Sequence, residues 1–454
     1  MERKTSRKAA GKLTGTAHFG TLTDSAWHRR LGLFGTVRTL GTLVFSVPSI
    51  RYGIPPWLDA VPVKKRPEFP AFGGVITHPV VVVGGGMSGA MTAYACAAAG
   101  LKVMLVEAGR IGSGGSGRAT GLLSGEAAES YRELEARAGR RVARALFDAM
   151  ESAPGELSSA VKRLGIKAGF ALRGGLRVLP AGDSDKALRK ELAARQAAGF
   201  AASWVVSAAI ARQTAIDSPG GMRLADAGFV DPFKLTLAFL AAAIKRGARV
   251  YERSRVKKIT FTRKTATAFL DGGSITTTNL AICIGEPTSL FKPLKRHLRH
   301  EDRYAVLTEP LPAAVRAELG QRAALICDTE SPAHQLWFTA DHRALVTGAD
   351  QKRPPDRLRE KTLVQRTGQL MYELSRLYPA ISGTRPAYGW DVPLAHPVDG
   401  VLYAGSHRNF PFHHFAFGTS HDPARAYLAS RIILRNIQGR PEKDDVHFSF
   451  ARNL

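Results

Sequence analysis

The pattern of apolar and polar positions is clearest over residues 79–121. Four consecutive valines at 80–83 are typical of a strand that is buried on both faces of a parallel sheet. The alanine-rich run over 87–99 predicts a helix that packs closely on a sheet, and Gly100 ends it. The apolar run over 101–106 predicts a second strand. The segment therefore predicts a strand, a glycine turn, a helix and another strand.

The glycine turn has the spacing G-x-G-x-x-G at Gly84, Gly86 and Gly89. The first glycine permits a tight turn, the second lets the backbone approach a pyrophosphate, and the third lets the helix pack against the strand. Glu107 ends the second strand, 18 residues after Gly89. A carboxylate there can accept hydrogen bonds from ribose hydroxyls. We predict a dinucleotide site, the alternative being a strand, turn and helix without a ligand.

Other elements follow from apolar periodicity and from helix caps. Asp231 is an expected N-cap and Pro232 the first helical residue. Helices are predicted over 126–164, 183–199, 233–246, 351–378 and 422–436, a strand pair over 171–180, and strands over 249–256 and 280–285.

A second glycine-rich stretch, GSGGSGRATG, occupies residues 112–121. It resembles the G-A-S-G-R-N-x-G loop of the D-amino-acid oxidase superfamily of flavoproteins, and most closely the branch of glycine, sarcosine and gamma-glutamylputrescine oxidases. In that family the loop runs beside the pyrophosphate and the flavin ring, so the resemblance implies FAD. Backbone N–H groups and Arg118 can also bind phosphate on physical grounds. A flexible surface connection is the alternative.

The resemblance covers roughly residues 55–440. It includes the turn at 228–232, the strand at 303–310 and the strand pair at 334–348. Trp337 stands where relatives often carry arginine. The resemblance implies an α/β fold, in which a Rossmann-like FAD-binding domain is joined to a second, mostly antiparallel sheet that forms the substrate domain. The expected segments are a basic, poorly ordered arm (1–52), the FAD-binding domain (53–165, 227–290 and, with a C-terminal tail, 381–454) and the substrate domain (166–226 and 291–380).

The cofactor-binding residues expected from the glycine pattern and the resemblance lie in three short segments and at four single positions. They are Gly84, Gly86, Met87, Ser88, Gly89, Glu107, Ala108, Gly115, Ser116, Arg118, Ala119, Thr120, Gly121, Val256, Gly285, Gly405 and Gly418. In relatives, a glycine-rich loop at the position of 405–418 leads to a helix whose N-terminus faces the flavin. Here histidine and phenylalanine replace several of those glycines.

The chemistry implied by the resemblance is oxidation of an amino acid or a secondary amine to an imine by hydride transfer to the flavin. A cation near the flavin favours its reduced form. The candidate catalytic residues are Arg303, His407, Arg408, His413 and His414. No metal site is predicted, because the three cysteines lack metal spacing and the His413-His414 pair has no suitably spaced acidic or cysteine partner.

Composition adds little to the choice of function but limits the partners. The chain has 454 residues and a formal net charge of +26. Lysine and arginine are spread along the whole length, which favours a basic solvated surface over a nucleic-acid or membrane site. The apolar run at 40–50 is too short to cross a bilayer. We expect a cytoplasmic enzyme with a small amine or amino-acid substrate, and with O2 or another electron acceptor.

Three alternatives concern the N-terminal segment and two concern function. Residues 1–52 are basic and rich in Ser, Thr and Gly, as in a poorly ordered arm, a targeting segment or an extension from a misplaced start codon. The altered 405–418 segment and Trp337 would suit an FAD-binding assembly or chaperone-like protein. The positive charge would suit flavin-dependent processing of modified tRNA.

Overall fold

The computed structural model describes residues 49–126, 129–419 and 421–452. Nearly all of the expected basic arm lies outside these ranges. Its last two residues form β1 (Arg51–Tyr52), which pairs in parallel with β20 (Pro386–Pro397). The described residues fold as one compact unit that contains four sheets.

The helices and strands have the following bounds. The α-helices are α1 Pro56–Asp59, α2 Met87–Ala98, α3 Gly115–Arg118, α4 Tyr131–Ala138, α5 Arg140–Leu164, α6 Lys186–Ala197, α7 Ser207–Thr214, α8 Pro232–Ile244, α9 Ala313–Ala317, α10 Asp356–Leu377 and α11 Pro423–Ile437. The 3-10 helices are η1 Val63–Lys65, η2 Ser289–His297, η3 Pro379–Ile381 and η4 Lys443–Phe448. The remaining strands are β2 Gly74–Thr77, β3 Val80–Val83, β4 Val103–Val106, β5 Leu122–Ser124, β6 Ala171–Leu172, β7 Gly175–Val178, β8 Ser203–Val206, β9 Gly220–Leu224, β10 Ala227–Phe229, β11 Arg249–Tyr251, β12 Val256–Phe261, β13 Ala266–Leu270, β14 Gly273–Thr277, β15 Asn279–Gly285, β16 Leu298–Thr308, β17 Leu325–Asp328, β18 Gln335–Phe338, β19 Ala344–Lys352, β21 Tyr403–His407 and β22 Phe410–Phe417.

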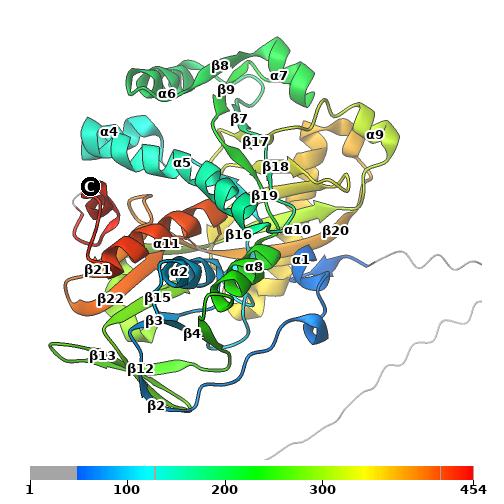
Figure 1. Ribbon diagram of the computed structural model, residues 1–454. Coiled ribbons are helices and arrows are strands. Elements are labelled where there is room, and N and C mark those ends of the chain that lie inside the picture. Colours follow the sequence, from blue (N-terminus) through cyan, green and yellow to red (C-terminus); the bar gives the residue numbers. More distant parts are fainter. Residues whose placement is uncertain (1–48, 127–128, 420, 453–454) are drawn as a thin grey trace, which may run out of the picture. The chain divides into compact units, whose positions relative to one another are not determined.

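The six-stranded sheet has the order β11-β4-β3-β15-β22-β21 and is parallel except for β21. Its strands bury both faces, as the valine run predicts. Val80 and Val82 belong to the core under α2, α8 and α11, whereas Val81 and Val83 pack toward the four-stranded sheet β12-β13-β14-β2. Figure 1 shows the three helices in front of these strands. The Rossmann-type α/β architecture is confirmed.

The nine-stranded sheet is mixed and has the order β1-β20-β16-β19-β18-β17-β7-β9-β8. Residues alternate between its two faces, with period 2. Val306 and Val346 pack in the core under α10, whereas Ala305 and Leu345 pack in the opposite core, where Trp57 and Trp390 meet edge to face. Alternate residues of the long strand β16 therefore belong to the cores on the two opposite faces of this sheet.

Several predicted elements are confirmed, namely strand β3, helix α2 and the helix that Asp231 caps by accepting hydrogen bonds from the N–H groups of Phe233 and Lys234. Two predictions were wrong. The predicted strand pair at 171–180 consists of β6 and β7, which belong to different sheets. The predicted strand at 249–256 ends at Tyr251, because the backbone turns through Arg253, whose φ is +48°, before β12 begins in another sheet.

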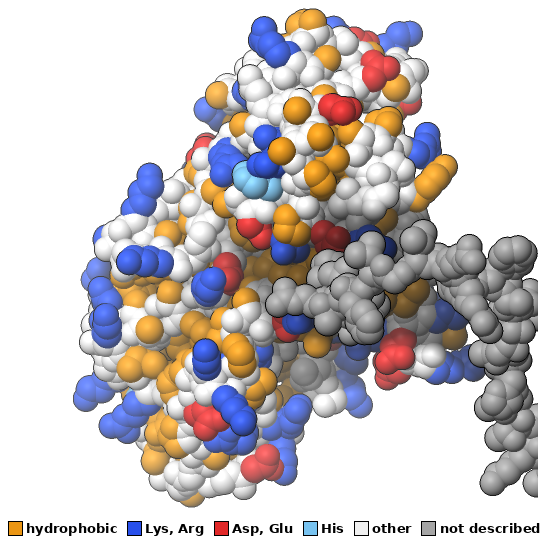
Figure 2. Space-filling view, turned by 90° about the vertical axis from the view of Figure 1, so that its right-hand side faces the viewer, with side chains coloured by type: hydrophobic (Ala, Val, Ile, Leu, Met, Phe, Trp, Pro, Cys, Tyr) orange, Lys and Arg blue, Asp and Glu red, His pale blue; other side chains and the backbone are white. Residues whose placement is uncertain are grey.

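Positive charge is distributed rather than concentrated on the face that Figure 2 shows. Lys and Arg side chains stand apart from one another there, with apolar and acidic side chains between them. Within the ranges that the structure describes, none of the helices has both the length and the apolar composition that a membrane crossing needs.

A buried ionic network ties α6 to the segment that follows β5. Arg195 is 2% exposed. Its two terminal nitrogens each lie 2.8 Å from a Glu126 oxygen, and its Nε lies 2.7 Å from Glu191. Glu191 also accepts a hydrogen bond from the Tyr131 N–H at the start of α4. Burial opposes ionisation of Glu126, but Arg177 and Arg195 hold the pKa of this carboxyl below its usual value.

Replacing Arg195 should therefore be strongly destabilising. Arg195→Met leaves the buried Glu191 without its cation and Glu126 with Arg177 alone, which costs about 3–5 kcal/mol of unfolding free energy. The control Lys190→Met changes an exposed residue of the same helix and should cost less than about 0.5 kcal/mol. Urea unfolding of both variants measures the difference, and equal stability would contradict this account of the network.

Candidate cofactor and substrate site

The glycine turn after β3 is built on very close backbone contacts. Gly84 has φ +110°, which L side chains rarely adopt. A Cβ on Gly89 would lie 1.8 Å from the carbonyl oxygen of Gly84, and one on Gly86 would lie 2.7 Å from Ser116 Oγ. The first turn of α2 thus packs directly on the end of the strand.

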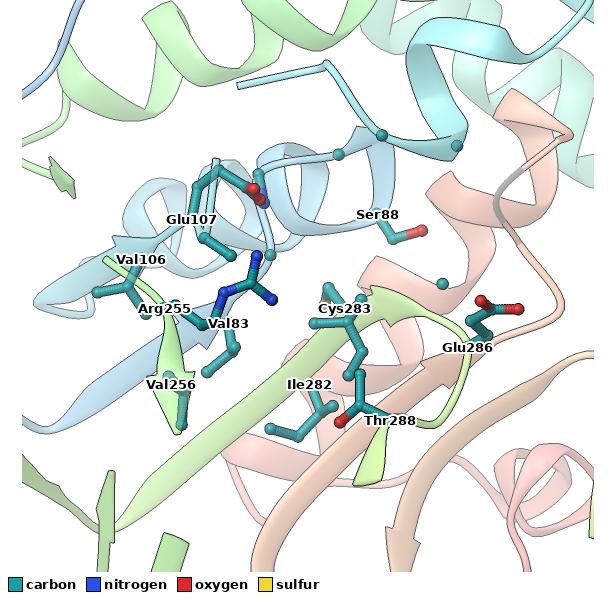
Figure 3. A pocket seen from close by; sticks show the side chains of 18 of the residues that line it. Val83, Ser88, Val106, Glu107, Arg255, Val256, Ile282, Cys283, Glu286 and Thr288 are labelled. Carbon is teal, nitrogen blue, oxygen red and sulfur yellow. The ribbon is translucent and has the colours of Figure 1, made fainter. Parts of the chain in front are cut away.

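A cavity opens at the carboxyl ends of β3, β4 and β15, and we call it the first cavity (Figure 3). In open parallel sheets this edge is where ligands bind. The Ser116 hydroxyl accepts a hydrogen bond of 2.8 Å from the Met87 N–H and so joins the two glycine-rich segments. Two helix N-termini, those of α2 and α3, border the cavity. This arrangement suits a pyrophosphate group.

Glu107 lines the first cavity and also fixes the turn. Its carboxylate accepts hydrogen bonds from the N–H groups of Gly85, at 2.6 Å, and Gly109, at 2.7 Å. Arg255 lies near the same end of the cavity as Glu107, whereas Ser88 and Glu286 lie near the other end (Figure 3). A ribose and a base therefore fit beside Glu107, and the phosphates fit toward Ser88.

A second cavity lies between the nine-stranded sheet and the N-terminus of α11. Its volume is about 560 Å³, within the usual range for small-molecule sites. Strand β20 contributes to the walls of both cavities. Its residues Pro393 and Ala395 line the first cavity, and Val392, Leu394 and His396 line the second.

Three of the four arginines that line the second cavity are paired with carboxylates: Arg177 with Glu126, Arg303 with Asp350 and Arg425 with Asp422. Arg299 is exposed and has no ion pair within the described residues. Arg303 donates hydrogen bonds of 2.8 and 2.7 Å to the two oxygens of Asp350. Arg425 is 8% exposed, lies 3.8 Å from Asp422 and donates a hydrogen bond to the carbonyl oxygen of Glu126. These arginines therefore bring little uncompensated positive charge to the cavity.

Two neutral imidazoles face each other in the second cavity. The ring centroids of His396 and His421 are 5.4 Å apart. Burial, followed by the charges of Arg303 and Arg425, lowers the pKa of His396 to about 4. Burial, together with His396 and Arg425, lowers the pKa of His421 well below its ordinary value. Both rings are uncharged at neutral pH, and His421 Nδ1 is buried without a hydrogen-bond partner in the described residues.

The structure brings many of the predicted cofactor residues to the first cavity, but not all of them. Those that line it are Gly84, Gly86, Ser88, Glu107, Ala108, Gly115, Ser116, Val256 and Gly285. Thr120 lines the second cavity. Neither lining includes Met87, Gly89, Arg118, Ala119, Gly121, Gly405 or Gly418. Of these, Arg118 is bound to Asp391 at 3.0 Å.

Four of the five predicted catalytic residues lie away from both cavities. Segment 403–417 is a β-hairpin of the six-stranded sheet, not a loop beside the flavin. His413 and His414 pair with Leu280 and Ala281, near the amino end of β15, and the turn of the hairpin carries His407 and Arg408. The first cavity lies at the opposite, carboxyl edge. The structure thus argues against their expected role and leaves Arg303, which lines the second cavity.

Some residues of the two cavities were missed in the sequence. Arg255 precedes the predicted Val256 and had no recognised motif. His421 and Asp422 begin the helix predicted at 422–436, where the Asp-Pro pair is itself an N-cap signal. His396 and Arg425 carry no local signal, since only the tertiary fold brings them together.

Comparison with known proteins agrees with this geometry. A family described as FAD dependent oxidoreductase (DAO) matches residues 79–419. The chain belongs to this family of FAD-dependent oxidoreductases. Its enzyme class and its cofactor, FAD, follow from that membership. The glycine-rich turns that line the first cavity fit this cofactor.

Individual relatives are distant but cover most of the chain. A probable oxidoreductase, OrdL, of Haemophilus influenzae is 24% identical, with 83% of this chain and 86% of that protein aligned. Gamma-glutamylputrescine oxidoreductase of Escherichia coli is 25% identical, over 85% of this chain and 89% of that protein. The crystal structure of glycine oxidase from Geobacillus kaustophilus has a TM-score of 0.68 at 17% identity, over 83% of this chain and 99% of that one. The last similarity supports the fold.

Gly89→Ala should impair FAD binding. The added methyl group would push α2 away from the end of β3, so we expect FAD affinity to fall at least about tenfold. Gly368→Ala is the control, because a Cβ there meets nothing within 4 Å. Quenching of flavin fluorescence in titrations of the apoprotein measures both affinities. Unchanged affinity in Gly89→Ala would contradict the assigned role of this close contact.

Proposed function

We propose that this FAD-dependent oxidoreductase oxidises a small amine to an imine in the second cavity, and that a substrate with a cationic amino group is preferred to one with a free carboxylate. The observation that carries the proposal is the charge of the cavity wall. Seven carboxylates and four arginines line it. A surplus of carboxylates favours binding of an ammonium ion. An amino acid is the alternative substrate class.

The best candidate to bind the ammonium group is Glu301. It lies on β16, two residues from Arg303, and lines the second cavity. Within the part of the chain that the structure describes, its side chain makes no ion pair or hydrogen bond, whereas Arg303 and Asp350 bind each other. Its charge is thus available to a ligand.

Oxidation requires the amine to be neutral and the site to be dry. When bound, FAD supplies the acceptor for the hydride that leaves the carbon next to nitrogen. The neutral imidazole of His421 offers a buried acceptor, Nδ1, for an N–H of the substrate. Leu122, Val392 and Leu394 are buried apolar residues of the cavity wall and limit the access of water to the reacting carbon.

Trp337 gives no support to the alternative of an assembly or chaperone-like protein. The residue is 2% exposed and stacks on Phe229 with 6.2 Å between ring centroids. The Arg173 guanidinium lies over the Trp337 ring, 5.0 Å from its centroid. It is a core residue of the nine-stranded sheet and offers no surface to a partner.

The test is anaerobic reduction of the flavin. The loaded protein is mixed with a panel of primary amines, secondary amines, diamines and amino acids, and the visible absorbance of the flavin is followed. We expect bleaching by amines that lack a carboxylate. Bleaching by none of the panel would contradict the proposed oxidation, and bleaching by amino acids alone would contradict the preference for amines.

Glu301→Gln should weaken substrate binding more than turnover. Loss of one carboxylate at a partly exposed position should raise KM for an amine substrate about fivefold, with a smaller effect on kcat. The exposed Glu318→Gln serves as the control. Steady-state kinetics with an artificial electron acceptor separates the two parameters, and an unchanged KM would rule out the assigned role of Glu301.

The pH dependence of flavin reduction should reflect ionisation of the substrate amine rather than ionisation of the two imidazoles. An ammonium nitrogen has no lone pair to assist departure of the hydride, so the rate should rise with pH as the amine loses its proton. His396 and His421 have lowered pKa values and stay neutral, so we expect no further inflection near pH ~6.5, the ordinary value for histidine. An inflection there that disappears in His421→Asn would show that the imidazole is charged in the working range.

A further inference from the structure

A cluster of four ionisable side chains lies where the β17–β18 turn meets α10. Asp328 ends β17, Glu330 lies in the turn, His334 immediately precedes β18, and Glu373 projects from α10. The ligand atoms of Asp328, Glu330 and His334 all lie within 4.8 Å of one another. The function proposed above uses none of the four as a catalytic group.

The imidazole of His334 lies among three carboxylates. Its Nδ1 lies 2.6 Å from Asp328 Oδ2 and 3.8 Å from Glu330 Oε2, and its Nε2 lies 3.1 Å from Glu373 Oε2. Metal-bound histidines commonly donate the second ring N–H to a carboxylate, which fixes the tautomer. Glu373 Oε2 lies close to Nε2 as a charge partner but accepts no hydrogen bond from it, and Nδ1 faces two carboxylate oxygens.

Contacts with neighbouring residues already orient Asp328 and His334. Asp328 Oδ1 accepts hydrogen bonds from the N–H groups of Glu330, at 3.1 Å, and His334, at 2.9 Å. Asp328 Oδ2 lies in hydrogen-bond contact with His334 Nδ1, at 2.6 Å, so a metal ion would have to replace the proton between these two atoms. The His334 ring packs on Gly348, where a Cβ would lie 2.5 Å from its Cδ2. Glu330, whose side chain is 54% exposed, is free to move the remaining distance.

The cluster also borders open space on two sides. Asp328 and Glu330 line the second cavity, and with His334 and Glu373 they line a third cavity, together with Val178, Ile326 and Leu374. A bound ion could therefore enter from solvent and keep a coordination position open for water. Three protein ligands and one open position are typical of accessible zinc sites.

We propose that Asp328, Glu330 and His334 Nδ1 bind a divalent transition-metal ion of the zinc class, with Glu373 orienting His334. A mixed nitrogen and carboxylate set favours Zn²⁺ over Mg²⁺, which prefers oxygen ligands. The ion would join the β17–β18 turn to α10 and neutralise two carboxylates in the wall of the second cavity. Metal binding would reduce the surplus of carboxylates on which the proposed preference for an amine rests, so the metal site is tested by ion binding alone, without a substrate.

The test is equilibrium binding of Zn²⁺ alone to the full-length, flavin-loaded protein, in competition with a chromophoric chelator. We expect one tight site per chain. His334→Gln should weaken it at least about a hundredfold, and Glu330→Gln and Glu373→Gln about tenfold each. Glu360→Gln, an exposed position on α10, should leave the affinity unchanged.

Two results would overturn the proposal. One is the absence of a site with micromolar or tighter affinity, which would make the cluster an ion pair that holds the turn to α10. The other is a tight site that survives in His334→Gln, which would place the ion elsewhere in the chain. Because the Glu330 side chain is exposed, Glu330→Gln keeps the test valid if His334→Gln fails to fold, which circular dichroism would reveal.

Discussion

The contact between the first turn of α2 and the end of β3 is the constraint on which the cofactor site depends. It requires glycine at Gly89, since a methyl group would meet the Gly84 carbonyl oxygen at 1.8 Å. The contact fixes the helix N-terminus at the carboxyl edge of the six-stranded sheet, where Ser116 and Glu107 hydrogen bond to the same turn. The dinucleotide cavity is therefore defined by backbone geometry before any side chain contributes to specificity.

The substrate side is organised differently, by compensation of buried charges. Arg303 is bound to Asp350, and the buried network of Arg195, Glu126 and Glu191 supports the segment that leads from β5. Three of the four arginines of the second cavity are paired, so the carboxylates, the neutral imidazoles and the exposed Arg299 determine how the cavity interacts with a ligand.

Local sequence predicted the parts of the molecule that depend on local rules. The valine run, the glycine spacing and the Asp231-Pro232 cap each specify an element within a few residues, and the family resemblance gave FAD and the two-part fold. The error over 405–418 arose from expecting a loop, although Phe415 and Phe417 alternate with smaller residues as in a strand. Strand β22 then carries His413 and His414 to the far edge of the sheet.

The pairing of distant residues could not be predicted in this way. His396 and His421 lie on different elements, and their low pKa values result from burial and from arginines elsewhere in the chain. Likewise, Glu373 lies on α10, which begins 18 residues after the end of β18 and is separated from it by strand β19, and yet it reaches His334. Such contacts follow from the packing of the sheets on the helices, which no short sequence motif encodes.

The most direct test of this account is a crystal structure of the flavin-loaded protein with a non-reactive amine that competes with the substrate. We predict that the amine lies in the second cavity, with its nitrogen near Glu301 and its carbon chain against Leu122 and Leu394. An amine bound outside this cavity, or bound there through a carboxylate to an arginine, would contradict the proposed function.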